Sequence, residues 1–312
     1  MTLPHVSVIV PTHNRAAMLG RAVASVLNQT YSDLELLVVD DASMDETGAV
    51  VASFTDPRVR YHRHDSNRHA SAARNTGIAH ARGAYIAFLD DDDEWLPAKL
   101  AKQVPVLDAI GPNVGLVYCW MDYFEGDNLV IERHPTLRGD VFYDVLDEQR
   151  LGNSSTLLLR REVVLRVGGF DESLPRGNDG DYIRRVCRDY QVEVVTEVLV
   201  KVHAGHADRI TNESEQGLRN AIIAEQAKLV KFAPELVARP AVHAAILRKI
   251  AGLYRRLGDQ EQAEAAQQQA NRIYKPPSLT LQRLYLRLPR PVQQFASRVH
   301  HARTAHRPSS GT

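Results

Sequence analysis

The chain of 312 residues contains only two cysteines, Cys119 and Cys187. Two cysteines are too few for a disulfide framework or a cysteine-rich zinc site, and they favour a reducing compartment. The sequence also lacks any run of roughly 18 apolar residues, the length that a membrane-spanning helix needs, and its start lacks the basic segment of a signal peptide. We therefore expect a cytoplasmic protein without a spanning helix.

An excess of basic charge is also absent, because 38 Lys and Arg residues balance 38 Asp and Glu residues. A general attraction to nucleic acid is therefore not expected. With 44% apolar and 24% charged residues, the composition is that of a soluble globular protein, and it excludes the disordered and collagen-like classes.

Strand-like and helix-like patterns alternate in the first part of the chain. Apolar runs at 6–10 and 34–39 predict buried strands, and the segment 16–28 between them predicts a helix. Such a unit, about 30 residues long, indicates a right-handed crossover in a parallel sheet covered on both faces. Similar patterns predict strands at 58–62, 84–89, 114–123, 156–159 and 192–202, and helices at 71–81, 97–110, 161–167 and 179–190.

From about residue 211 the pattern becomes helical, with amphipathic helices predicted at 221–232 and 242–257. We therefore expect an α/β domain over residues 1–210 and a helical region over 211–312. The tripeptide 257–259, Leu-Gly-Asp, is typical of a turn between two packed helices and resembles one unit of a helical repeat.

Polar residues follow three of the predicted strands. Pro11, Thr12 and Arg15 follow the first strand, Asp41 follows the second, and four consecutive aspartates, 90–93, follow the strand at 84–89. In an open α/β sheet, ligands bind beyond the carboxyl ends of the strands. The three clusters therefore predict one site at this edge of the sheet.

The four aspartates repel one another unless a cation offsets their charge. Carboxylate oxygens suit Mg²⁺ or Mn²⁺, which proteins bind through one or two carboxylates together with substrate phosphates. The alternative is a solvated acidic turn. The apolar residues on both sides, Phe88-Leu89 and Trp95-Leu96, favour a metal site.

Three other polar residues each have a functional and a structural interpretation. Asp41 is suited to accept hydrogen bonds from a base or a ribose, or it caps the next turn with Ser43. Arg74 is suited to bind diphosphate oxygens, or it pairs with one of the aspartates. Asp179 either caps the helix predicted at 179–190 or is the general base that a hydroxyl-activating transferase needs.

Four segments resemble glycosyltransferase family 2 in their order and spacing: VSVIVPTHNR, LLVVDDAS, SAARNTGIAHARGAYIAFLDDDDEWLPAKL and GGFDESLPRGNDGDYIRR. The resemblance covers about residues 5–210. It implies a GT-A fold, Rossmann-like with a mostly parallel central sheet flanked by helices, and inverting transfer of a sugar from a nucleoside-diphosphate sugar, with UDP favoured. It also implies that Pro11, Thr12 and Arg15 lie against the nucleotide and that Asp41 accepts a hydrogen bond from the base.

The resemblance further places Asp90, Asp91 and Asp92 in the Asp-x-Asp segment of the family, with Asp92 as the direct ligand of Mg²⁺ or Mn²⁺. It implies that Asp179 is the catalytic base, although Asn178 stands where the family often has a glutamate. The acceptor is expected to be a saccharide or a lipid-linked saccharide in cell-surface polysaccharide or glycolipid synthesis.

Family members often carry a histidine after the last strand that closes the metal or diphosphate site. The segment 201–206 offers His203 and His206, of which His206 is favoured as a metal ligand. The alternative is a surface histidine.

The end of the chain is basic. No acidic residue follows Glu264, whereas residues 272–312 carry eight Lys and Arg, interleaved with apolar residues between 279 and 288. This composition predicts contact with an anionic membrane surface, on its inner face. The alternatives are packing against the acidic catalytic domain or a disordered end.

Two other functions are open. A nucleotidyltransferase would also have acidic metal ligands on an α/β sheet, but the Gly-rich, lysine-bearing phosphate loop that it needs after the first strand is absent. A non-catalytic nucleotide-sugar binding module is disfavoured because Asp92 and Asp179 are both present.

Overall fold

The structure is a computed structural model that describes residues 3–148, 150–204 and 214–275. The chain divides into two compact units, 1–213 and 214–312. The predicted boundary at residue 210 and the basic segment from 276 onwards lie outside the described residues, as does His206. Among the described residues, no helix combines the length and the apolarity needed to cross a bilayer.

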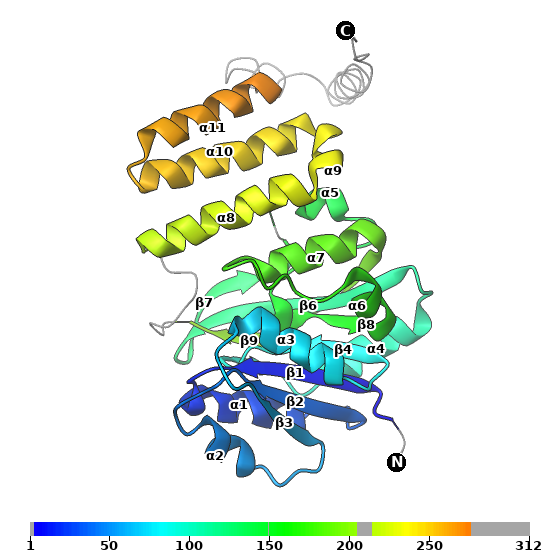
Figure 1. Ribbon diagram of the computed structural model, residues 1–312. Helices are drawn as coiled ribbons and strands as arrows, with labels where there is room; N and C mark the ends of the chain where they lie inside the picture. The colour runs from blue at the N-terminus through cyan, green and yellow to red at the C-terminus, as the bar shows by residue number, and fades with distance from the viewer. Residues whose placement is uncertain (1–2, 149, 205–213, 276–312) are drawn as a thin grey trace. The chain divides into compact units, whose positions relative to one another are not determined.

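One mixed sheet forms the centre of the first unit (Figure 1), with strand order β3-β2-β1-β4-β8-β6-β9-β5 and with β7 paired to β6. The strands β3, β2, β1 and β4 are parallel to one another, as the sequence predicts, and antiparallel pairs join β4 to β8 and β8 to β6. The strands are β1 (Val6–Thr12), β2 (Leu34–Asp40), β3 (Val59–Arg63), β4 (Tyr85–Phe88), β5 (Asp93–Trp95), β6 (Val114–Glu125), β7 (Asn128–Arg133), β8 (Leu158–Arg160) and β9 (Gln191–His203).

Helices cover both faces of this sheet (Figure 1). Val6, Val8 and Val10 of β1 share a core with residues of α1 and α4, and Ile9 points to the opposite face, where α3 lies. A Cβ atom at Gly77 would clash with Ile9, so this glycine lets α3 pack directly on β1. The helices are α1 (Ala16–Leu27), α2 (Thr47–Ala52), α3 (His69–His80), α4 (Lys99–Ala109), α5 (Phe142–Val145), α6 (Arg161–Val167) and α7 (Asn178–Asp189).

The second unit is helical, as predicted. It contains α8 (Glu215–Lys231), α9 (Ala233–Val237), α10 (Pro240–Arg256) and α11 (Gln260–Ile273). The last two helices pack together around Ala244, Leu247 and Ala270, and Gly258 turns the chain between them with a φ of 79°. Helix α8 begins six residues before the predicted start at 221, because the Ser214 side chain caps the helix by accepting a hydrogen bond from the Gly217 N–H.

Glu35 in β2 is a buried ionic centre at the amino-terminal edge of the sheet. Its side chain is 3% exposed and accepts hydrogen bonds from Ser7, Arg60 and Arg82. Burial by itself would raise the pKa of Glu35, but these hydrogen bonds lower it below its ordinary value. The folded state therefore favours the ionised carboxylate.

We expect Glu35→Gln to lower the free energy of unfolding at pH 7 by about 2–3 kcal/mol. This loss is smaller than that from breaking a fully buried ion pair, because Arg82 is half exposed. The contribution is complete above the ordinary glutamate pKa of 4.5 and is lost as the pH falls through the lowered folded pKa. Urea denaturation at pH 7 and pH 3 measures it. The exposed Glu148→Gln is the control, and an equal loss at both pH values would contradict the assignment.

Candidate active site

The loops at the carboxyl edge of the parallel strands hold three non-glycine residues with a left-handed backbone. These are Asn14 (φ 52°), Ala42 (φ 61°) and His69 (φ 68°), which follow β1, follow β2 and begin α3. The first two loops are joined, because the Asn14 N–H donates to Ser43 Oγ and the Met44 N–H donates to Asn14 Oδ1. Such conformations cost free energy and concentrate at functional sites.

Arg15 joins the loop after β1 to the acidic segment. Its Nη1 lies 3.1 Å from Asp91 Oδ1 and 2.7 Å from Asp92 Oδ2. Pro11 and Thr12, the other residues predicted to lie against a nucleotide, end β1 and are buried. The structure therefore brings Arg15 of the first predicted cluster against the aspartates.

Asp41 is 2% exposed and holds the loop before α3. Its Oδ1 lies 2.8 Å from His64 Nδ1 and accepts from the Arg68 N–H over 2.8 Å. The turn after β2 is capped by Asp40, whose Oδ1 accepts from the Ser43 N–H. The capping role considered for Asp41 therefore belongs to its neighbour.

Three of the four consecutive aspartates form a cluster that could hold a cation. Asp90, Asp92 and Asp93 each offer a carboxylate oxygen, and these oxygens lie within 4.8 Å of one another. Oxygen ligands at this spacing fit Mg²⁺ or Mn²⁺. Asp93 was not predicted as an individual ligand; it enters the cluster because β5 pairs with β9.

Asp91 lies outside this cluster and faces Arg15. Burial raises the pKa of Asp91 to about 6, the positive charge of Arg15 opposes that rise, and the carboxylates of Asp92 and Asp90 add to it. Asp91 thus orients Arg15 beside the cluster.

Arg74 in α3 lies between the acidic cluster and Asp179. The residue is 6% exposed, and its Nη2 lies 2.5 Å from Asp90 Oδ1 and 4.0 Å from Asp179 Oδ1. Pairing with an aspartate was one of the two interpretations of this arginine. The structure shows that pair, which places a positive charge between the two carboxylates.

Asp179 is the second residue of α7, and its side chain is 28% exposed. Its Oδ2 accepts a long hydrogen bond, 3.4 Å, from the Ser154 N–H. Burial raises the pKa of Asp179, and the nearby Arg74 opposes this rise. A carboxylate with a raised pKa is a stronger proton acceptor than an exposed aspartate, which suits a general base.

Of the two candidate histidines, the structure describes only His203. It ends β9, and its Nε2 lies 3.1 Å from Glu94 Oε2. His206 lies in the stretch 205–213, outside the described residues, so its predicted metal contact stays a prediction.

Sequence reasoning missed the segment 153–155, Asn-Ser-Ser. Ser154 Oγ donates to Asp90 Oδ1 over 3.2 Å, and Ser155 Oγ donates to Asp93 Oδ2 over 2.6 Å. The available signal was a run of small polar residues directly before a predicted strand. Its importance depends on the antiparallel pairing of β8 with β4, which the sequence alone does not predict.

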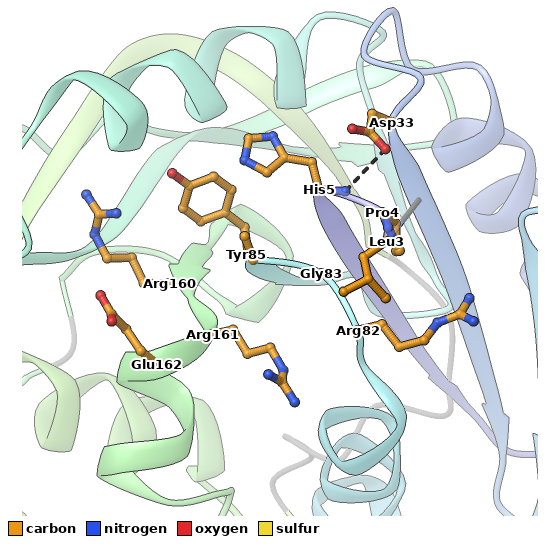
Figure 2. A pocket seen from close by; sticks show the side chains of 11 residues that line it. Leu3, Pro4, His5, Asp33, Arg82, Gly83, Tyr85, Arg160, Arg161 and Glu162 are labelled. Atoms are coloured by element: carbon orange, nitrogen blue, oxygen red, sulfur yellow. Dashed lines mark hydrogen bonds between the residues drawn. The ribbon is translucent and has the colours of Figure 1, made fainter. Parts of the chain in front are cut away.

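A cavity of about 640 Å³ opens at the other edge of the sheet (Figure 2). Its lining includes Leu3 and His5 before β1, Arg82 before β4, and Arg160 at the end of β8, and none of its lining residues was predicted as a site residue. Ligands of open α/β sheets bind at the carboxyl ends of the parallel strands. We therefore assign the functional site to the acidic edge.

Comparisons with known proteins identify the family of the chain. Residues 7–168 match the family model described as glycosyl transferase family 2. The succinoglycan biosynthesis protein ExoO of Rhizobium meliloti is 35% identical over 57% of this chain and 54% of its own. The UDP-Glc:alpha-D-GlcNAc-diphosphoundecaprenol beta-1,3-glucosyltransferase WfgD of Escherichia coli is 36% identical over 40% of this chain and 49% of its own. The chain thus spans about half the length of these relatives.

The fold also has solved counterparts. The mannosyltransferase PcManGT from Pyrobaculum calidifontis, solved in complex with GDP-Man and Mn²⁺, superposes with a TM-score of 0.58 at 23% identity. The superposition covers 98% of this chain and 86% of that one. This likeness confirms the predicted GT-A fold, and the family match, which spans more than half of the chain, shows that the protein belongs to glycosyltransferase family 2.

Proposed function

We propose that the protein transfers a sugar from a nucleoside-diphosphate sugar to an acceptor hydroxyl, with inversion at the anomeric carbon and with Mg²⁺ or Mn²⁺ as cofactor. One observation carries the proposal. The carboxylate oxygens of three aspartates, Asp90, Asp92 and Asp93, lie within 4.8 Å of one another. Arg74 contacts both Asp90 and Asp179, so Asp179, from a distant part of the chain, lies beside the same cluster. A cation site and a proton acceptor are the two devices that this reaction needs.

The acidic cluster would hold the divalent cation, with Asp92 as the principal ligand. When bound, such an ion neutralises the charge that grows on a leaving diphosphate. Arg15 lies against Asp92, so its guanidinium is placed to contact phosphate oxygens at the same position. Pro11, Thr12 and Asp41 would line the nucleotide side, since they border the strained loops after β1 and β2.

Asp179 would act as the general base. Its carboxylate takes the proton from the acceptor hydroxyl while the hydroxyl oxygen attacks the anomeric carbon on the face opposite the leaving diphosphate. A single displacement inverts the configuration. No covalent glycosyl-enzyme forms, so the site needs no nucleophilic side chain.

The relatives favour a UDP-linked donor and a lipid-linked saccharide acceptor in cell-surface polysaccharide synthesis. The Escherichia coli relative is named for UDP-Glc and a diphosphoundecaprenol-linked sugar, and the Rhizobium meliloti relative is named for succinoglycan biosynthesis. An acceptor of this kind lies at a membrane. The basic segment 272–312, of which 272–275 are described, would bind the anionic inner surface.

A donor panel tests the proposed function. We expect the full chain to release nucleoside diphosphate from UDP-glucose, UDP-N-acetylglucosamine or GDP-mannose in the presence of Mn²⁺, and to stop when a chelator is added. In a parallel reaction with UTP and glucose 1-phosphate in place of the donor, release of pyrophosphate would indicate a nucleotidyltransferase. Donor binding without any release would indicate a non-catalytic module.

Arg74→Met should move the acid limb of the kcat profile to higher pH. The positive charge of Arg74 lowers the pKa of Asp179, so its removal raises that pKa further and reduces the deprotonated fraction of the base at a given pH. Profiles measured from pH 5 to pH 8 at saturating Mn²⁺ and donor check this. The control is Arg219→Met on the second unit, and an unchanged limb in Arg74→Met would remove Asp179 as the titrating base.

A further inference from the structure

Asn153 and Ser155 lie beside the acidic cluster in a buried polar turn. Ser155 belongs to a 3-10 helix, Ser154–Thr156, and is 0% exposed. Burying a hydroxyl costs free energy unless it is hydrogen bonded. The partners of Ser155 therefore explain why a serine stands at this position.

The pairing of β8 with β4 places the turn. The antiparallel register aligns Tyr85 with Arg160 and Ala87 with Leu158. The same register, continued three residues past Ala87 and three residues before Leu158, brings Asp90 beside Ser155. The Asp90 N–H donates a hydrogen bond to Ser155 Oγ over 3.1 Å. The turn is thus anchored to the strand that delivers the aspartates.

Both side chains donate to the same oxygen of Asp93. Ser155 Oγ lies 2.6 Å from Asp93 Oδ2, and Asn153 Nδ2 lies 3.0 Å from it. Two donors on one carboxylate oxygen fix the rotation of the carboxylate. Side chains that hold a metal-binding carboxylate in this way typically contribute about 10–100-fold to metal affinity.

The shape of the turn depends on Gly152. Its φ is 128°, a value that favours glycine, and a Cβ atom there would lie 2.7 Å from Thr156 Oγ1. Thr156 Oγ1 in turn donates to the Asn153 carbonyl over 2.8 Å. A backbone that admits only glycine at its start therefore presents Asn153 and Ser155 to Asp93.

We propose that Asn153 and Ser155 are positioning residues that hold Asp93 in the orientation that binds the divalent cation. The inference rests on the proposed function for the presence of that cation. Neither residue is assigned a contact with substrate, and their effect passes through Asp93.

The test is direct titration of Mn²⁺ against the full chain without donor, with free Mn²⁺ measured by electron paramagnetic resonance. Asn153→Ala and Ser155→Ala should each raise the Kd for Mn²⁺ by about 10-fold. In an Asp93→Asn background, Asn153→Ala should have little further effect, because the carboxylate that it orients is gone. A merely structural role would weaken binding equally in both backgrounds.

Ser25→Ala is the matched control. Ser25 Oγ accepts a hydrogen bond from the N–H of Trp95, which lies in the same short strand as Asp93, and donates one to the Ala22 carbonyl, so neither of these bonds involves a carboxylate. Its Kd for Mn²⁺ should equal that of the wild type. If Ser155→Ala fails to fold in a thermal melt, Asn153→Ala decides alone, because that side chain is only partly buried.

Wild-type affinity in folded Asn153→Ala overturns the inference, and so does a wild-type chain that binds no Mn²⁺. A chain that binds Mn²⁺ with the expected losses in the variants, yet releases no nucleoside diphosphate from any donor, would contradict the proposed function and leave this inference standing.

Discussion

Replacing Asp179 by asparagine should lower kcat by about 10²–10⁴-fold and leave the affinity for the donor nearly unchanged. Asparagine keeps the size of the side chain and can still contact Arg74 and the Ser154 N–H, but it cannot take a proton from the acceptor. Steady-state kinetics with varied donor, together with direct donor binding, separates the two effects.

Asp189→Asn, at the exposed end of the same helix, is the control for removing a negative charge from α7. Its kcat should stay at the wild-type value. A variant of Asp179 that loses donor affinity while the bound complex turns over normally would identify Asp179 as a binding residue, and the base would then lie elsewhere.

Asp92→Ala should reduce transfer by roughly 10³-fold or more, because a divalent cation supplies several kcal/mol of charge stabilisation in the transition state. Without Asp92 the cluster keeps only two carboxylates, those of Asp90 and Asp93. The loss should appear both in released nucleoside diphosphate and in the Kd for Mn²⁺.

The control is Asp127→Ala, which removes an equal charge in the exposed turn between β6 and β7, distant in sequence from the acidic segment. It should change neither the release of nucleoside diphosphate nor the Kd for Mn²⁺. Full activity in Asp92→Ala, or undiminished turnover of the wild type in excess chelator, would remove the metal from the mechanism.

Local patterns were sufficient to predict the parallel half of the sheet. Residues 6–10 and 34–39 are buried on both faces, and such strands appear in a sequence as continuous apolar runs. Their carboxyl ends necessarily share one edge, so the meeting of Arg15 with the aspartates also follows from the order of the elements.

Other parts of the site depend on contacts between distant segments. The short strand β5 begins with Asp93, a residue type disfavoured in strands, and it forms because β9 pairs with it. Ser155 reaches Asp90 through the antiparallel pairing of β8, and the partner of Arg74 depends on how α3 lies on the sheet. Side-chain partners of this kind are set by tertiary packing, which no local pattern encodes.

The anomeric configuration of the first product tests the central claim most directly, and water can serve as the acceptor. With Mn²⁺ and an α-linked UDP-sugar, slow hydrolysis followed by proton nuclear magnetic resonance should show the β-anomer of the free sugar before mutarotation, and Asp179→Asn should suppress it. Initial release of the α-anomer, or a covalent glycosyl adduct detected on the protein by mass spectrometry, would contradict a single inverting displacement assisted by Asp179.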